Sequence, residues 1–100
     1  MALKLKRLDA AKYFDTPEAQ AELLEDAFAT GDTRYIANAL GTVARARNMS
    51  QVARDAGVTR EALYKALSDK GDPRLSTLLG VSKALGFQLS VKSSNPDQAA

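Results

Sequence analysis

The chain of 100 residues has the length of one domain, and hydrophobic residues make up 45% of it, which is enough to build a core. It contains no cysteine and no histidine, so disulfide scaffolds and thiolate metal sites are excluded, and the commonest metal ligand and general base are missing. The net charge of +2 is unevenly distributed, because residues 1–31 hold four basic and six acidic side chains and residues 32–74 hold eight basic and five acidic ones. We therefore expect a protein without metal, cofactor or catalytic site, whose basic middle section favours nucleic acid as a partner.

The N-terminal third of the chain contains one predicted helix. Residues 2–8 alternate apolar and basic side chains, a pattern that fits a short strand, an arm that orders on a partner, or a frayed terminus. Thr16 and Pro17 then form a helix start, with a capping hydroxyl followed by proline at the first helical position, and Gly31 ends this helix. Its apolar stripe consists of Leu23, Leu24, Ala27 and Phe28.

A second helix is expected between Asp32, which can cap it, and Asn48. Gly41 lies inside this helix, where glycine costs about 1 kcal/mol relative to alanine. We interpret this glycine as a mark of close packing against another helix.

Residues 50–67 predict two short helices joined by a tight turn, which is the pattern of a helix-turn-helix. The first helix begins at Ser50 and stops at Gly57, which can adopt the left-handed conformation. The second is capped by Thr59, runs to about Ser68, and has its core anchors at Leu63 and Leu67. The buried face of the first helix would consist of Val52, Ala53 and Ala56.

The free face of the second helix carries side chains suited to the major groove of DNA. Arg60 can pair with a guanine edge or a phosphate, and Glu61 can accept from cytosine or hold Arg60 in place. Tyr64 can contact a thymine methyl, a phosphate or a neighbouring helix, and Lys65 suits a phosphate. The candidate DNA-contacting residues are Ser50, Gln51, Thr59, Arg60, Glu61, Tyr64, Lys65, Lys70 and Arg74.

The remaining chain predicts one more helix and a strand. Residues 69–73 contain turn-forming residues, and a helix is expected from Leu75 to Leu85, broken by Gly86. Residues 87–92 alternate strictly between apolar and polar, which predicts a short strand, and residues 93–100 have the composition of a disordered tail. The predicted fold is all-α, a single domain over residues 1–92 with five helices, a short C-terminal strand and residues 1–31 as an N-terminal extension.

Five segments carry a resemblance to a known family: residues 8–14, 36–41, 44–53, 57–68 and 83–87. Together they make residues 8–92 similar to Xre/Cro-like repressor domains, and most similar to the HigA-like addiction-module antidote proteins, which are antitoxins. The resemblance implies a five-helix helix-turn-helix fold, repression of the protein's own operon, and neutralisation of a small basic toxin of the RelE/ParE-like superfamily. Asn48 departs from the family pattern, in which glycine is common before Met49 and Ser50.

The acidic N-terminal third is a candidate surface for a basic toxin, because opposite charges steer encounter. The candidate contacts are Tyr13, Phe14, Glu18 and Glu22. The competing interpretation is that the apolar stripe of this segment packs on the core and that its acidic side chains are simply solvated.

The helix-turn-helix pattern predicts a non-enzymatic protein that binds palindromic operator DNA as a homodimer in the bacterial cytoplasm, associated with the nucleoid, and the family resemblance implies that it is an antitoxin. The alternatives are a repressor without a toxin, a helical adaptor that binds no nucleic acid, and a small enzyme. No apolar run approaches the roughly 20 residues of a membrane span. For the dimer, residues 87–92 could pair with the same segment of a second copy or with residues 2–8 of the same chain.

Overall fold

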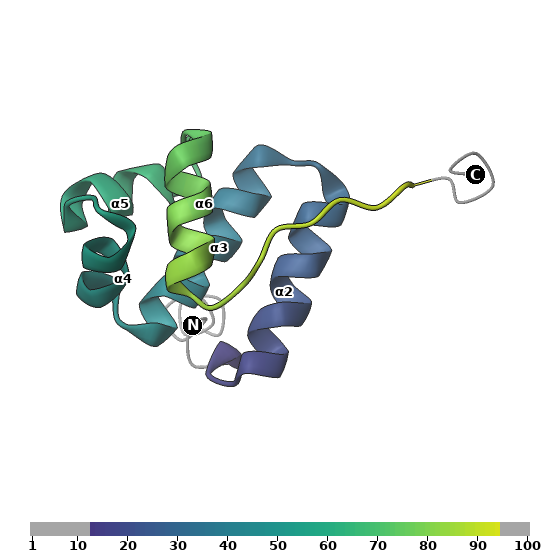
Figure 1. The fold of residues 1–100 in the computed structure, drawn as a ribbon, viewed down its shortest axis with the longest axis horizontal. Coiled ribbons are helices and arrows are strands. Elements are labelled where there is room, and N and C mark those ends of the chain that lie inside the picture. The colour runs from purple at the N-terminus through teal and green to yellow at the C-terminus, as the bar shows by residue number, and fades with distance from the viewer. Residues whose placement is uncertain (1–12, 95–100) are drawn as a thin grey trace, which may run out of the picture.

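The computed structural model describes residues 13–94, which fold into five helices and, within these residues, no strand. The all-helical prediction is confirmed for this part of the chain. In Figure 1, α2 lies at one end of the molecule and the α4–α5 pair at the other, with α3 and α6 between them. The helices are α2 (Pro17–Thr30), α3 (Thr33–Arg47), α4 (Met49–Ala56), α5 (Arg60–Ala66) and α6 (Leu75–Ala84).

The first two helix boundaries are set by the predicted caps. The Thr16 hydroxyl accepts a hydrogen bond from the Ala19 backbone N–H at 3.2 Å, and Gly31 ends α2 in the left-handed conformation with φ 70°. The Asp32 carboxylate accepts from the Arg34 backbone N–H at 3.0 Å and so begins α3. These caps use only side chains within three residues of the helix end, which is why they could be predicted.

The core is formed by all five helices. The stripe of α2 packs inward on α3, because Leu24 and Ala27 are buried and Leu23 and Phe28 are packed against the core. The interpretation that this stripe serves the fold is therefore confirmed. The buried apolar residues are Leu24, Ala27, Ala37, Ala39, Leu40, Val43, Ala44, Met49, Val52, Ala53, Leu63, Leu67, Val81 and Leu85.

A buried glutamine ties the N-terminal turn to the end of α3. The Gln20 side chain is only 2% exposed; its amide nitrogen donates to the Phe14 carbonyl oxygen at 2.8 Å. Its amide oxygen accepts from the Arg47 guanidinium at 2.8 Å. Both ends of the amide are thus satisfied, as burial requires, and Arg47 has a structural partner.

Two glycines allow backbones to approach closely. A Cβ at Gly41 would lie 2.4 Å from the Leu67 carbonyl oxygen, so the predicted close packing at this glycine is confirmed, and the neighbour is the end of α5. A Cβ at Gly71 would lie 2.1 Å from the Ala66 carbonyl oxygen. Residues 69–73 therefore fold back onto the end of α5, which their turn composition alone did not indicate.

The predicted C-terminal strand is not present. The Phe87 backbone N–H donates to the Ser82 carbonyl oxygen at 2.8 Å, after which residues 88–92 run extended without a strand partner in the described chain. The physical reason is that alternation favours an extended backbone, whereas a strand also requires a neighbouring backbone to pair with. Residues 2–8 and 95–100 lie outside the described residues, so the interpretations of these segments remain predictions.

The last helix exposes part of its apolar surface. Leu75 and Leu79 of α6 are 68% and 49% exposed, whereas Val81 and Leu85 are buried. No helix in the described part of the chain is long and apolar enough to cross a membrane.

Candidate nucleic-acid interface

The turn between α4 and α5 has a closed hydrogen-bonded geometry. Gly57 takes φ 77°, its backbone N–H donates to the Arg54 carbonyl at 3.1 Å, and the Val58 N–H donates to the Ala53 carbonyl at 3.0 Å. These two bonds form the Schellman arrangement that stops a helix at a left-handed glycine. The Thr59 hydroxyl then accepts from the Ala62 N–H at 3.0 Å and begins α5.

The second helix of this pair is fixed to the body by one face. Leu63 is fully buried and Leu67 is 2% exposed, as the sequence predicts. The rest of α5 is open to solvent, and its exposed side chains are Ala62 and the four polar residues Arg60, Glu61, Tyr64 and Lys65. The structure therefore brings these four candidate residues together on one helix at the end of the molecule (Figure 1).

Two of these side chains contact each other. The Arg60 guanidinium carbon lies 5.3 Å from the centre of the Tyr64 ring, and a guanidinium nitrogen donates to the Tyr64 hydroxyl at 3.4 Å. Such a cation–π contact at an exposed site is worth about 0.5–1 kcal/mol. The sequence analysis did not anticipate this pair, although the four-residue spacing on a helix could have indicated it.

Tyr64 also faces α3. Its side chain lines a pocket of about 400 Å³ together with Thr42 and Arg45, among others. The Arg45 guanidinium donates to the Thr42 hydroxyl at 3.3 Å. Tyr64 is 42% exposed, so it contributes both to the surface of α5 and to this hollow beside α3.

The start of α4 depends on Asn48, which joins it to α3. Asn48 adopts φ 153° and ψ 103°, and it is the one non-glycine residue with positive φ in the described chain. This conformation explains why glycine suits the position. The Asn48 side-chain oxygen accepts from the Gln51 backbone N–H at 3.2 Å and so caps α4.

The two candidate residues of α4, Ser50 and Gln51, are both exposed. The Gln51 side chain is already engaged within the helix, because its nitrogen donates to Asp55 at 2.9 Å and its oxygen accepts from Arg54 at 3.0 Å. A phosphate contact by this side chain would have to replace one of these bonds.

Lys70 and Arg74 lie in the connection that leads from α5 to α6, and both are exposed. All eight basic and all five acidic side chains of residues 32–74 are exposed, so the net charge of +3 acts at the surface. Positive surface charge over this part of the chain favours a polyanion.

The other end of the molecule is acidic. Residues 13–31 contain five carboxylates and no basic side chain, and all five are exposed. The structure places Tyr13, which is 70% exposed, and the half-buried Phe14 just before α2, with Glu18 and Glu22 exposed on its first two turns.

Asp26 has a partner on the next helix. Its carboxylate accepts from the Tyr35 hydroxyl at 2.5 Å, and this hydrogen bond is the main cause of a raised pKa of Tyr35, with burial and the negative charge of Asp26 adding to it. The bond links α2 to α3 at the surface.

Fold and surface thus define a small all-helical protein with a two-helix unit at one end and an acidic helix at the other. The chain belongs to the family of probable addiction module antidote proteins, whose family model matches residues 4–93. It is 45% identical over 94 residues to an uncharacterized protein of Haemophilus influenzae, a match that covers 94% of this chain and 97% of that relative. No solved structure matches significantly. Membership of this family supports an antitoxin role, implies a toxin partner and favours a regulatory over a catalytic protein.

Proposed function

We propose that this protein is the antitoxin of a type II toxin–antitoxin module, which binds operator DNA through α4 and α5, represses its own operon and neutralises a small basic toxin of the RelE/ParE-like type. The observation that carries the DNA-binding part is the open face of α5. Its polar side chains project from a short helix that Leu63, Leu67 and the capped turn hold rigidly to the body. A short, rigidly mounted helix with such a face is what enters the major groove in helix-turn-helix proteins.

In this proposal α5 is the recognition helix of an Xre/Cro-like helix-turn-helix, and α4 lies across the sugar–phosphate backbone of the DNA. Arg60 at the first position of α5 supplies guanidinium donors beyond the one that meets Tyr64, and these suit the O6 and N7 acceptors of guanine. Glu61 suits the amino group of cytosine. The phosphate contacts would come from Ser50, Gln51, Thr59, Lys65, Lys70 and Arg74.

The protein would act as a homodimer on a palindromic operator. Two recognition helices related by a twofold axis fit half-sites about 34 Å apart, which is one turn of DNA. Residues 1–92 would form one domain in each copy.

The acidic end is proposed as the toxin-binding surface, with Tyr13, Phe14, Glu18 and Glu22 as its contacts. The absence of basic side chains from residues 13–31 supports this assignment, because a negative surface repels DNA and attracts a basic protein. A repressor without a toxin is the second candidate. Co-purification with the product of the adjacent gene decides between them.

The DNA-binding part is tested with the promoter region of the protein's own gene. Arg60→Ala should weaken operator binding by about 1–3 kcal/mol and relax base preference, if Arg60 contacts guanine. Lys70→Ala should instead weaken operator and random DNA alike and lower the salt slope by about one unit. Binding is measured by fluorescence anisotropy across a salt series.

Arg34→Ala is the matched control, because Arg34 is an exposed arginine in the first turn of α3, beside α2. It should leave operator binding unchanged. If Arg60→Ala weakened all DNA equally, Arg60 would be a phosphate contact, and if the wild-type protein bound no DNA at all, the proposed function would be refuted.

A further inference from the structure

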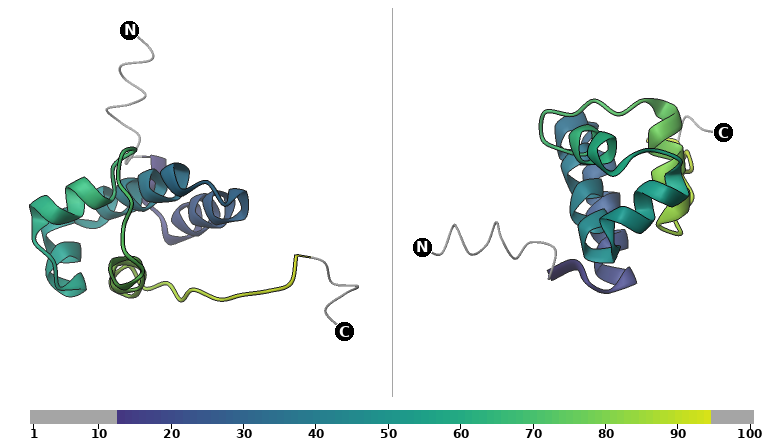
Figure 2. Two further views of the ribbon diagram at one scale, coloured as in Figure 1. Left: turned by 90° about the horizontal axis from the view of Figure 1, so that it is seen from above. Right: turned by 90° about the vertical axis from the view of Figure 1, so that its left-hand side faces the viewer.

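Residues 88–92 form an extended segment whose backbone makes no hydrogen bond to the backbone of residues 13–94. The last backbone hydrogen bond before it runs from the Phe87 N–H to the Ser82 carbonyl oxygen, and none involves residues 88–92 within the described chain. Figure 2 shows the segment leaving the C-terminal end of α6 as an extended trace on the outside of the helices. An extended backbone with unpaired N–H and C=O groups is a template for another strand.

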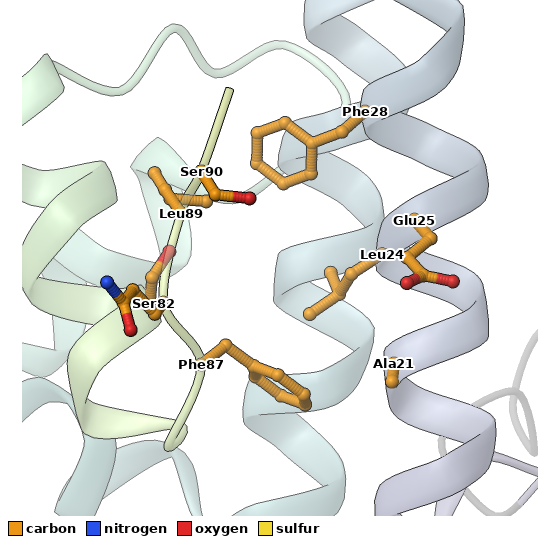
Figure 3. Close-up of a pocket in the computed structure, with 9 residues that line it drawn as sticks. Ala21, Leu24, Glu25, Phe28, Ser82, Phe87, Leu89 and Ser90 are labelled. Atoms are coloured by element: carbon orange, nitrogen blue, oxygen red, sulfur yellow. The ribbon is translucent and has the colours of Figure 1, made fainter. Parts of the chain in front are cut away.

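The two faces of this segment differ. Phe87 and Leu89 are half-buried, whereas Gln88 and Ser90 are exposed. Phe87 and Leu89 line a pocket of about 250 Å³ with Leu24 and Phe28 of α2 on its other side, as Figure 3 shows. Gln88 and Ser90 line the same pocket, but Phe87 and Leu89 are the more buried residues of the segment.

Val91 continues this apolar alternation but has nothing to pack on. It follows Phe87 and Leu89 at a spacing of two, which places it on the same face of an extended chain. It is nevertheless 99% exposed. A partner that covers Val91 would complete the face that Phe87 and Leu89 begin.

We propose that this partner is residues 87–92 of a second copy, paired antiparallel across a twofold axis with Leu89 opposite its own counterpart. The inference rests on the homodimer in the proposed function and names the surface that forms it.

Side-chain chemistry selects this register. With Leu89 at the twofold axis, Val91 lies opposite Phe87 of the second copy, and Gln88 lies opposite Ser90 on the other face, so apolar meets apolar and polar meets polar. A twofold axis between residues 89 and 90 would set apolar side chains against polar ones. A shift to Ser90 would leave Phe87 opposite Ser93 and lose an apolar pair.

Charge also favours a second copy over other occupants. Residues 87–91 bear no charged side chain, and Lys92 would lie opposite Gly86, so no like charges face each other. A basic toxin would find no acidic side chain on the segment itself.

Single cysteines test the register, since the chain has none of its own. In the isolated protein, without DNA or toxin, Leu89→Cys should form a disulfide-linked dimer under mild oxidation, because opposed residues lie about 4.5–5.5 Å apart. Val91→Cys is the matched control: its two copies would be four residues apart along the ribbon, about 13 Å, which is too far for a disulfide. Circular dichroism confirms that both variants are folded.

A second measurement probes the same contact without cysteine. Val91→Asp should raise the dimer dissociation constant at least tenfold in sedimentation equilibrium, although Val91 is exposed in the single chain. Gln88→Asp adds the same charge to the polar face of the segment and should change the dimer dissociation constant by less than about threefold.

Several outcomes would overturn the strand pairing. The first is a wild-type protein that is monomeric at micromolar concentration. The second is disulfide cross-linking of the Val91→Cys or Ser90→Cys variant in preference to the Leu89→Cys variant. The third is a Val91→Asp variant that dimerises as the wild type does. If Val91→Asp instead abolished toxin co-purification and left dimerisation intact, the segment would belong to the toxin interface. Failure of the proposed function would look different, since the cross-linked dimer would form but bind neither operator nor toxin.

Discussion

At the scale of single residues, Asn48 combines two opposing effects. Its side chain caps α4, while its backbone takes φ 153°, a conformation that costs a non-glycine residue about 1–3 kcal/mol. Glycine would remove the strain and lose only a few tenths of a kcal/mol of capping. The family resemblance, in which glycine is common here, agrees with this geometry.

Asn48→Gly should therefore stabilise the protein by about 1 kcal/mol. Asn48→Ala should destabilise it by about 1 kcal/mol, because alanine keeps the strain and loses the cap. Urea denaturation monitored by circular dichroism measures both changes. A less stable Asn48→Gly variant would show that the cap outweighs the strain.

Tyr64 is the residue that orients Arg60. Tyr64→Phe keeps the ring beneath the guanidinium but removes the hydroxyl acceptor, whereas Tyr64→Ala removes both contacts. We expect Tyr64→Phe to bind operator nearly normally and Tyr64→Ala to lose about 1 kcal/mol of affinity, because Arg60 then has to be ordered on binding. Anisotropy titrations compare the two variants. Equal losses would mean that the hydroxyl itself contacts DNA.

At the scale of elements, the connection between α5 and α6 packs closely against the end of α5, which is possible only because residue 71 is a glycine without a side chain. Gly71 approaches the end of α5 so closely that any Cβ would clash with the backbone of Ala66. Its own N–H donates to the Ser68 carbonyl at 2.9 Å. This contact positions Lys70, and with it one proposed phosphate contact.

Gly71→Ala should cost about 1–3 kcal/mol of stability, because backbone rather than a flexible side chain has to move. It should also weaken DNA binding by shifting Lys70. Asp72→Ala, at an exposed neighbouring position, is the control and should stay within about 0.5 kcal/mol of the wild type. Thermal melts and anisotropy titrations are the measurements, and a Gly71→Ala variant with unchanged melting temperature would contradict the close approach.

At the scale of the whole molecule, the two proposed surfaces lie at opposite ends. α2 is acidic and distant from the α4–α5 pair in Figure 1, yet it is also part of the core through Leu24 and Ala27. Deleting residues 1–31 would thus unfold the protein rather than remove one function. Surface substitutions are the appropriate test.

The double variant Glu18→Lys and Glu22→Lys should fold normally, since both side chains are exposed. It should lose affinity for a basic toxin at least tenfold, because like charges then meet at the interface. Operator binding should be retained. Pull-down with the toxin and anisotropy with operator DNA separate the two activities, and full toxin binding by the double variant would remove α2 from the toxin interface.

The sequence by itself determined the five helices and several of their ends, although α4 begins at Met49 and not at Ser50, and α5 ends at Ala66 and not near Ser68. Thr16, Asp32, Gly57 and Thr59 act on backbone groups one to three residues away, and the buried Leu63 follows from helical spacing, so neighbours along the chain are sufficient. The exposed face of α5 followed from the same spacing.

Only the tertiary structure decided which surfaces are covered. The exposure of Leu75 and Leu79, the burial of Gln20 against Arg47 and the fold-back at Gly71 all depend on segments distant in sequence. Residues 87–92 show most clearly what the sequence alone leaves undecided. Their alternation specifies an extended backbone, but a strand exists only where a second backbone supplies the hydrogen bonds, and residues 13–94 supply none.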